Sequence, residues 1–306
     1  MLLAPFLFCC IVFTMQTVVT HSGSFDPDDV LAIASLQLYL GVENTKVIRS
    51  RNKEIIDSAD WVVDVGGVYD AEKRRFDHHQ NGVPKRENGI PYSAFGLIWK
   101  EFGVAICDSE SLALHIERKL VYPIDAADNH IAISHPNKQD VIPFEFFDVI
   151  DAIKPVWGSE ESFDSQFLQA VEFARGLLER KIMHGKARVA VSEKIKANYD
   201  SAVRKSILVF SESIPRHFFI EFQEVRVVVT PVPSPDSDCW MASVIPVSRY
   251  GFQNRAIFPE SWGGLVDGDL EKESGVEGAV FCHKERYIFV AKTKESALKA
   301  AGHAFE

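Results

Sequence analysis

The chain has 306 residues, of which 46% are hydrophobic and 25% are charged, as expected for a soluble globular protein with room for two domains. Its formal net charge of −10 argues against a protein that clamps long nucleic acid, because such proteins carry basic surfaces that contact the phosphates. An acidic chain would hold a phosphorylated substrate through metal ions and a few local cations, which favours short or small substrates.

Residues 1–14 are almost wholly apolar, and one interpretation of them is a signal peptide. No Lys or Arg precedes the apolar run, and the run is too short to span a bilayer. A start at Met15 would place a strand-like segment directly at the beginning of the chain. We therefore favour an upstream extension or a mis-called start over secretion.

Five cysteines are present, and none of them has C-x-x-C spacing. An odd number of cysteines without such pairs argues against a disulfide framework or a zinc knuckle and indicates a reducing compartment. We expect a cytoplasmic protein that does not associate with membranes.

Strand-like and helix-like segments alternate through the N-terminal half. Strands are expected at residues 17–20, 46–49, 61–65 and 74–76, and helices at residues 30–40, 93–102 and 109–120, the last continuing towards residue 129. This alternation predicts an α/β fold whose mostly parallel sheet is covered by helices on both faces. In such a sheet, ligands bind beyond the carboxyl ends of the strands.

The C-terminal half begins with a long helical pattern over residues 162–205, which is most simply a core or inter-domain helix. A second α/β region follows, with strands expected at residues 206–210, 225–230, 240–246 and 279–282 and a final helix at residues 294–301. We therefore predict an N-terminal extension (1–14), a metal-binding catalytic domain (15–160), a helical connector (161–205) and a smaller α/β substrate-binding domain (206–306).

The first motif lies between the first expected strand and the first expected helix. His21 ends the strand, Gly23 permits a tight turn, and the D-x-D spacing of Asp26 and Asp28 could direct two carboxylates towards different metal ions. Alternatively, Asp28 or Asp29 could cap the following helix, since Asp is a favoured capping residue. We favour capping for Asp29 and metal binding for Asp26 and Asp28.

Three further motifs carry acidic or imidazole groups. Asp64 lies in an apolar segment before two glycines, where an unpaired carboxylate would be costly without a metal ion or a hydrogen-bonded partner. The run Asp77–His79 could, by itself, be a polar surface turn. Asp125 and Asp128 have the i, i+3 spacing of one helix face, although Asp128 could equally bond its own backbone.

Imidazole and carboxylate groups without an accompanying thiolate suit borderline-hard divalent ions such as Mn²⁺, with Mg²⁺ as the alternative. The set is large enough for two metal ions that share a bridging carboxylate, which is a usual arrangement for hydrolysing phosphate esters. The sequence therefore predicts a metal-dependent phosphoesterase.

The order of these motifs resembles the DHH phosphoesterase superfamily and, within it, the melanocyte-proliferating-gene-type (MYG or GAMM) family. The similarity covers about residues 18–301 and is carried by the runs 20–25, 62–70, 75–80, 93–98, 125–129, 252–255 and 258–265. MYG-type proteins usually read His-Cys-Asp-Glu where this chain has Asp26–Asp29, which matches the D-x-D of the wider superfamily. They also have a glycine-rich run after the position of His283, where this chain has no glycine through Val290.

The resemblance implies a DHH-type fold of two lobes with the metal ions between them, and a 3′→5′ exonuclease activity on RNA. It implies one metal ion held by His21, Asp26 and Asp64. It implies a second metal ion held by Asp28, Asp64, His78 and one of Asp125 or Asp128, with Asp64 bridging the two. His79 would contact the scissile phosphate or protonate the leaving oxygen, beside the catalytic Asp64. We choose Arg255 as the cation of the C-terminal domain that binds the substrate phosphate, with a structural ion pair as the alternative.

The leading substrate is short single-stranded RNA or another small nucleotide. A small-molecule phosphatase or pyrophosphatase remains open because the chain is acidic. A third alternative is a non-catalytic, metal-stabilised binding protein, against which the intact His21, Asp64 and His78 argue. A homodimer is also open.

Overall fold

The computed structural model describes residues 14–134, 140–248, 251 and 253–304. The expected N-terminal extension, apart from Thr14, therefore lies outside the described residues. The chain divides into two compact units, residues 1–185 and 186–306, and the division falls within its longest helix. None of the described helices combines the length and the apolar composition that crossing a membrane requires.

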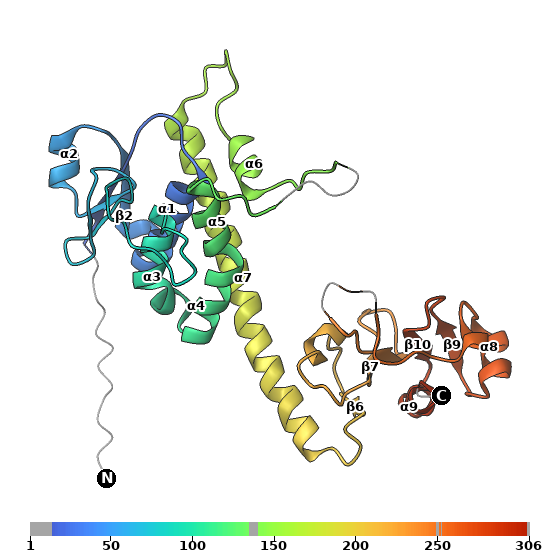
Figure 1. Ribbon diagram of the computed structural model, residues 1–306. Helices are drawn as coiled ribbons and strands as arrows, with labels where there is room; N and C mark the ends of the chain where they lie inside the picture. The colour runs from blue at the N-terminus through green and yellow to red at the C-terminus, as the bar shows by residue number, and fades with distance from the viewer. Residues whose placement is uncertain (1–13, 135–139, 249–250, 252, 305–306) are drawn as a thin grey trace, which may run out of the picture. The chain divides into compact units, whose positions relative to one another are not determined.

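The first unit is built on a five-stranded sheet in the order β2-β1-β3-β5-β4. Figure 1 draws this sheet in blue and blue-green and labels its strand β2. The strands are β1 (Gln16–Thr20), β2 (Thr45–Arg49), β3 (Trp61–Val63), β4 (Tyr69–Asp70) and β5 (Arg75–Phe76). Strands β2, β1, β3 and β5 are parallel, and only the short edge strand β4 runs antiparallel to its neighbour. The predicted mostly parallel sheet is confirmed.

Helices cover the sheet of the first unit. They are α1 (Pro27–Leu40), α2 (Lys53–Ser58), α3 (Ala94–Cys107), α4 (Glu110–Ile116), α5 (Tyr122–Asp128), α6 (Phe146–Asp151) and α7 (Phe163–Ser201), with a 3₁₀ turn at Val42–Asn44. Alternate strand residues face opposite sides, as the period of two requires. Val18 and Val63 belong to the main core, whereas Val19 and Val62 pack with Ile56 of α2.

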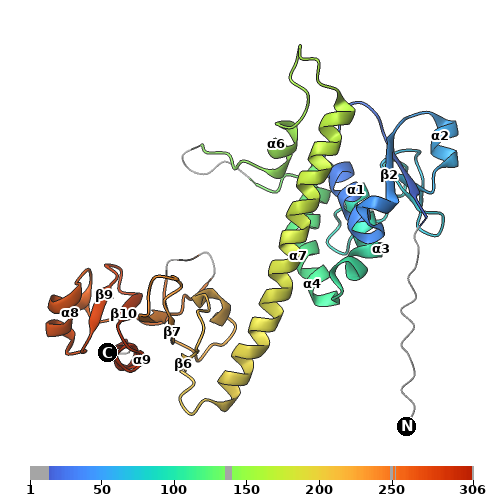
Figure 2. The same ribbon diagram turned by 180° about the vertical axis from the view of Figure 1, so that it is seen from behind.

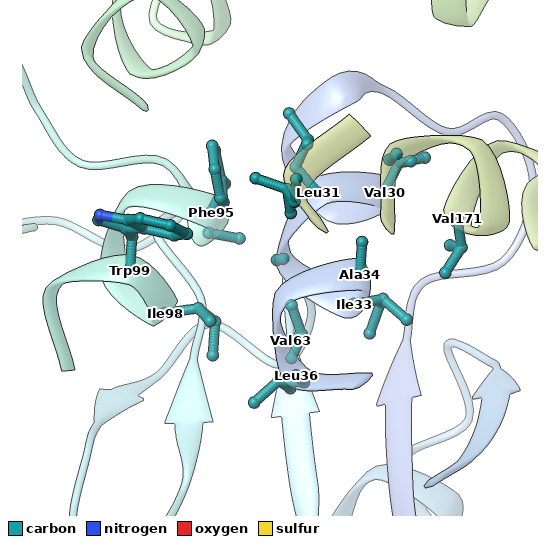
Figure 3. Packing of buried hydrophobic residues seen from close by; sticks show 14 of the residues in the cluster. Val30, Leu31, Ile33, Ala34, Leu36, Val63, Phe95, Ile98, Trp99 and Val171 are labelled. Carbon is teal, nitrogen blue, oxygen red and sulfur yellow. The ribbon is translucent and has the colours of Figure 1, made fainter. Parts of the chain in front are cut away.

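The main core of the first unit joins three helices. Figure 3 shows the side chains of α1 between those of Phe95 and Trp99 on α3 and that of Val171 on α7. Helix α1 is buried around most of its circumference, which is typical of a helix inside an α/β layer. The buried residues of α7 that join this core lie between Phe167 and Ile182, and Figure 2 shows this part of α7 alongside α1.

One predicted helix is interrupted. The pattern predicts a helix from residue 109 towards residue 129, but the chain forms α4, a π-helical turn (Glu117–Val121) and then α5. Pro123 lies in the first turn of α5, where its missing N–H group and its ring prevent a regular helix from continuing. The π-helical segment is short, as is typical of π turns inside α-helices.

The second unit has a five-stranded sheet in the order β6-β7-β8-β10-β9, in which only β6 and β7 are parallel. Its elements are β6 (Ile207–Val209), β7 (Val227–Pro231), β8 (Trp240–Val244), β9 (Ala279–Cys282), β10 (Ile288–Ala291), α8 (Asp267–Ser274), α9 (Lys294–His303) and 3₁₀ turns at Arg216–Phe219 and Glu260–Trp262. Phe258, Trp262 and Phe289 pack with the alanines of α9 in its core. The predicted smaller α/β unit is confirmed.

Five elements have no counterpart in the sequence-based prediction. They are α2, β4, α6, α8 and β10. Helices α2 and α6 have six residues each and β4 has two, so a periodic pattern cannot develop within them. Helix α8 is mostly polar, and Leu270 is its one buried residue.

Candidate active site

The candidate site lies at the carboxyl edge of the first sheet. His21 directly follows β1, Asp64 directly follows β3, and His78 lies two residues beyond β5. Because these strands are parallel neighbours, their ends meet at one edge. Asp28 and Asp29 lie in the first turn of α1, which begins soon after β1.

Asp64 stands between two imidazole groups. His21 Nε2 lies 3.2 Å from Asp64 Oδ2, and His78 Nε2 lies 3.3 Å from Asp64 Oδ1. Further carboxylates complete each side of the cluster. Asp29 Oδ2 lies 3.1 Å from His21 Nε2, while Asp28 Oδ2 and Asp128 Oδ2 lie 3.6 and 3.5 Å from His78 Nε2. The arrangement thus forms two neighbouring ligand sets that share Asp64.

The donor set fits divalent metal ions. Among the described residues, four buried carboxylate oxygens of the cluster accept no hydrogen bond, namely Asp28 Oδ2, Asp29 Oδ2, Asp64 Oδ1 and Asp128 Oδ2. Burying carboxylate oxygens without a hydrogen bond is costly, and a cation at this position would satisfy them. Ligand atoms within 4.8 Å of one another form the groups His21–Asp29–Asp64, Asp28–His78–Asp128 and Asp64–His78–His79. Nitrogen and oxygen ligands without sulfur suit Mn²⁺ or Mg²⁺.

The cluster opens into a cavity of about 560 Å³. Its lining includes five aspartates, three histidines and one arginine, together with the backbone of Gly66 and Gly67. This volume is within the usual range for a site that holds a small ligand of nucleotide size.

The backbone at Asp64 is in the left-handed region, with φ of 55°. Most residues avoid this region, and an aspartate that occupies it at the end of a buried strand is a sign of a functional constraint. The conformation turns the chain sharply into Gly66 and Gly67, which also have positive φ.

Burial and opposite charges set the electrostatics of the cluster. Burial opposes the charge on His21, but contacts with Asp29 and Asp64 outweigh it and raise the pKa of His21 to about 10. Burial also opposes the charge on Asp64, but contacts with His21 and His78 hold the pKa of Asp64 below its usual range. Burial raises the pKa of Asp28 and Asp29, and repulsion from Asp64 adds to this effect.

We expect Mn²⁺ binding to release protons, because His21 must lose its proton before its nitrogen can bind a metal ion. Since the pKa of His21 is about 10, about one proton should leave this residue at pH 7. The Mn²⁺ affinity should then rise about tenfold per pH unit between pH 6 and 8 for each proton released. Isothermal titration calorimetry in two buffers of different ionisation enthalpy measures the proton count. Equal heats in the two buffers would contradict this expectation.

His79 is held by a buried carboxylate. Its Nδ1 lies 2.7 Å from Asp77 Oδ1, and Asp77 also accepts hydrogen bonds from the backbone N–H groups of Gly67, His78 and His79. With so many donors around it, Asp77 is an acceptor, so the Nδ1 atom of His79 carries a proton. The His79 side chain is 63% exposed and lines the cavity, and its Nε2 atom has no hydrogen-bond or ion-pair partner among the described residues.

The sequence predicts metal binding for Asp26 and helix capping for Asp29, and the structure places both residues differently. Asp26 is the capping residue of α1, and its half-exposed side chain at the rim of the cavity pairs with Lys154 at 3.1 Å. Asp29 Oδ1 accepts the Asp26 N–H at 3.0 Å, while its Oδ2 faces His21. Asp29 therefore supports the helix end and also belongs to the cluster. The acidic Glu in the matching place of the MYG pattern was the signal that could have identified it.

Asp125 lies outside the cluster, whereas Asp128 lies within it. Asp125 Oδ2 accepts a hydrogen bond from Arg86 Nε at 2.7 Å, and its Oδ1 accepts one from Ser93 Oγ at 2.7 Å. A Cβ atom at Gly96 would lie 2.3 Å from Asp125 Oδ1, so only glycine fits where α3 meets this carboxylate. The protein thus saturates Asp125 with its own donors.

Arg255 lies in the second unit and is engaged with the backbone. Its guanidinium donates hydrogen bonds to the carbonyl oxygens of Ile220, Phe222 and Val225. These contacts hold the turn before β7 and engage both terminal nitrogens of Arg255. We therefore do not propose Arg255 as a residue that binds substrate.

The fold and this site define an α/β protein with a candidate metal centre at the carboxyl edge of a parallel sheet. Residues 17–305 match the MYG1_exonuc family, which is described as an uncharacterised protein family (UPF0160). A MYG1 protein of Chlamydia pneumoniae is 31% identical over 290 residues, which cover 93% of this chain and 95% of the relative. A MYG1 protein of Saccharomyces cerevisiae is 30% identical over 320 residues, which cover 94% of both chains.

A MYG1 exonuclease of Rattus norvegicus is 26% identical over 324 residues, which cover 92% of this chain and 82% of the relative. A solved structure of a pGpG-specific phosphodiesterase from Vibrio cholerae is similar over 90% of this chain and 92% of its own, at 13% identity and a TM-score of 0.35. The chain belongs to the MYG1_exonuc family, and the predicted MYG membership is confirmed.

Proposed function

We propose that the protein is a metal-dependent phosphodiesterase of the DHH type that removes nucleotides from the 3′ end of short single-stranded RNA. The observation that carries the proposal is the cluster of His and Asp side chains around Asp64, in which four buried carboxylate oxygens of the described residues accept no hydrogen bond, beside a cavity. Membership in the MYG1_exonuc family supports a hydrolytic enzyme that acts on phosphodiester bonds, and the rat relative is named an exonuclease.

The proposed ligand sets follow the geometry of the cluster. His21, Asp29 and Asp64 would hold one divalent ion, while Asp28, Asp64, His78 and Asp128 would hold the other. Mn²⁺ is the first choice and Mg²⁺ the second. Two such ions would neutralise phosphate charge and lower the pKa of a water molecule to near neutrality.

His79 is the proposed general acid. Because Asp77 holds the proton on Nδ1, the Nε2 atom is the one available to protonate the leaving oxygen. Protonation at Nε2 places a positive charge on the ring, which the buried Asp77 carboxylate stabilises. Asp77 is thus a positioning residue that sets the tautomer of His79.

Replacing His79 with Gln should lower kcat for a 5-nucleotide RNA about 100-fold, because the leaving oxygen would lose its proton donor. Mn²⁺ stoichiometry should stay unchanged, since neither of the two proposed ligand sets includes His79. The matched control is His184→Gln, which alters an exposed histidine on α7 of the same unit. Equal kcat values for the two variants would rule out His79 as the acid.

The test of the proposed function compares a 5-nucleotide RNA, a DNA of the same sequence, and pyrophosphate, each with Mn²⁺, Mg²⁺ or EDTA. RNA labelled at one end or the other shows the direction of cleavage. We expect stepwise release of mononucleotides from the 3′ end of the RNA, and EDTA should abolish it. Loss from the 5′ end would overturn the proposed polarity.

A second candidate function is a small-molecule phosphatase or pyrophosphatase. The observation that favours it is the cavity, whose described lining has five aspartates but a single arginine, in a chain with a net charge of −10. Release of phosphate from pyrophosphate alone would establish this function instead. Tight Mn²⁺ binding without turnover of any substrate would favour the non-catalytic binding protein.

We propose the cytoplasm as the compartment of the protein. The basis for this compartment is the odd number of cysteines without C-x-x-C spacing in the sequence. A homodimer stays an open alternative to a monomer.

A further inference from the structure

Arg51 lies at the same carboxyl edge of the first sheet as the cluster of His and Asp side chains around Asp64. It follows β2 by two residues, and the neighbouring Ser50 N–H donates a hydrogen bond to Thr20 O at 2.8 Å. This bond sets the chain after β2 beside the loop after β1, which carries His21. Among the described residues that line the cavity, Arg51 is the only arginine or lysine.

Arg51 and Arg49 are separated by one residue but have different environments. The Arg49 side chain is 3% exposed, is stacked against the rings of Phe25 and Phe167, and pairs with Asp164 at 2.9 Å. Its second terminal nitrogen donates to Gly23 O at 2.7 Å. All of these contacts belong to the fold, so Arg49 has a structural role.

The guanidinium of Arg51 is anchored at one atom only. Its Nε donates to Ser22 O at 3.3 Å, and within the described parts of the chain neither terminal nitrogen has a hydrogen-bond or ion-pair partner. Ser22 is adjacent to His21, whose Nδ1 lies 3.4 Å from the same carbonyl oxygen. The Nε atom of Arg51 is therefore tied to the loop that carries His21, while the two terminal N–H₂ groups stay available.

The charges around the cavity indicate what these groups would bind. Five aspartates line the cavity, and Asp29 of the proposed ligand set brings the number of carboxylates to six. Two divalent ions, together with Lys154 beside Asp26, would supply five positive charges against them. An anionic substrate entering this site would therefore meet net negative charge unless another cation were present. Arg51 supplies that cation, and a planar fork matches two oxygens of one phosphate group.

We infer that Arg51 binds a phosphate group of the substrate through its two terminal nitrogens, while its Nε atom stays anchored on Ser22 O. This inference rests on the proposed function and assigns the substrate-binding cation to the first unit. It also limits the class of ligand to phosphate-bearing nucleotides. An uncharged nucleoside offers the Arg51 guanidinium no phosphate oxygens to bind.

The test compares Arg51→Gln and Arg51→Lys with a matched control, Lys53→Gln. Lys53 is the next cation along the chain, its side chain is 85% exposed, and it pairs only with Asp57 at 2.6 Å among the described residues. One measurement is KM and kcat for the 5-nucleotide RNA in Mn²⁺. The other is the binding of AMP and of adenosine in Mn²⁺ by calorimetry, which requires no turnover.

Arg51→Gln should raise KM for the RNA and weaken AMP binding by about 10- to 100-fold, the usual effect of losing a charge-assisted hydrogen bond. Adenosine binding and Mn²⁺ stoichiometry should not change. Arg51→Lys should fall between Arg51→Gln and the unmodified protein, because it keeps the charge but loses the fork. Lys53→Gln should match the unmodified protein.

Equal AMP affinity and equal KM for Arg51→Gln and Lys53→Gln would overturn the inference. An equal loss of AMP and adenosine binding would also overturn it, because phosphate would then not be the group recognised. If the unmodified protein turns over none of the substrates, the proposed function fails, and the AMP measurement still decides the role of Arg51. The two failures are thus distinguishable.

Discussion

Asp64→Asn should reduce hydrolysis of a 5-nucleotide RNA by at least about 1000-fold and should lower the number of Mn²⁺ ions bound. Both effects follow from the position of Asp64, whose two oxygens face His21 on one side and His78 on the other. The substitution removes the one negative charge that the two ligand sets share, so both should weaken together. Steady-state kinetics and Mn²⁺ titration by calorimetry measure the two quantities.

Asparagine is the right replacement because the backbone of Asp64 has φ of 55° and asparagine tolerates this conformation better than alanine does. The matched control is Asp57→Asn, which removes an exposed carboxylate on α2 of the same unit. Asp26→Asn forms an informative third variant, since Asp26 lies at the rim and pairs with Lys154. A loss of Mn²⁺ in Asp26→Asn as large as that in Asp64→Asn would contradict the ligand set with Asp29. Full activity of Asp64→Asn would contradict the site itself.

Arg86→Met should lower the free energy of unfolding by about 3–5 kcal/mol, the typical cost of leaving a buried charge without its partner. The Arg86 side chain is 2% exposed, and its Nη2 lies 2.6 Å from the fully buried Asp125 Oδ2. Its guanidinium also pairs with Glu117 and lies over the rings of Tyr92 and Tyr122, at 4.2 and 4.1 Å from their centroids. Urea unfolding measures the change.

The loss should be partly reversed by a second substitution, Asp125→Asn, which removes the stranded charge and keeps an acceptor for Ser93. Arg75→Met is a suitable control, because Arg75 donates only to backbone carbonyls and forms no ion pair in the described residues. If the double variant lost as much stability, relative to the unmodified protein, as Arg86→Met and Asp125→Asn lose together, the charge explanation would fail.

The effect of Arg86→Met should depend on pH in a defined direction. Burial raises the pKa of Asp125 to about 6, even though Arg86 and Ser93 lower it in part. Removing Arg86 should raise this pKa further, so the folded variant would hold its proton to higher pH than the unfolded chain does. Stability contributed by a raised carboxyl pKa is lost as pH increases. The stability difference between the two proteins should therefore be larger at pH 8 than at pH 6.

The elements that carry the candidate site could largely be predicted from the sequence. Apolar runs before His21, Asp64 and His78 predicted β1, β3 and β5, and those strands are present. The position of these three residues at one edge of the sheet then follows, because parallel strands end on the same side. Short elements such as α2 were not predictable, since six residues cannot establish a helical period.

The choice among neighbouring carboxylates required the tertiary structure. Asp26 and Asp29 lie in one motif, but Asp26 pairs with Lys154, which is 128 residues away along the chain. Asp125 and Asp128 lie on one helix, but Asp125 pairs with Arg86, which is 39 residues away. Local patterns contain no information about such partners, so spacing alone could not separate the members of each pair.

The sequence by itself therefore determined the fold class, the family and the strand ends at which the His and Asp groups gather. Hydrophobic periodicity and residue order are local properties, and they suffice for those conclusions. Only the tertiary structure decided that Asp29 and Asp128 join the cluster, that Arg255 holds backbone carbonyls, and that Arg51 faces the cavity. The physical reason is that packing between distant segments sets which charged group lies beside a given side chain. Burying a charge is costly unless such a partner is present.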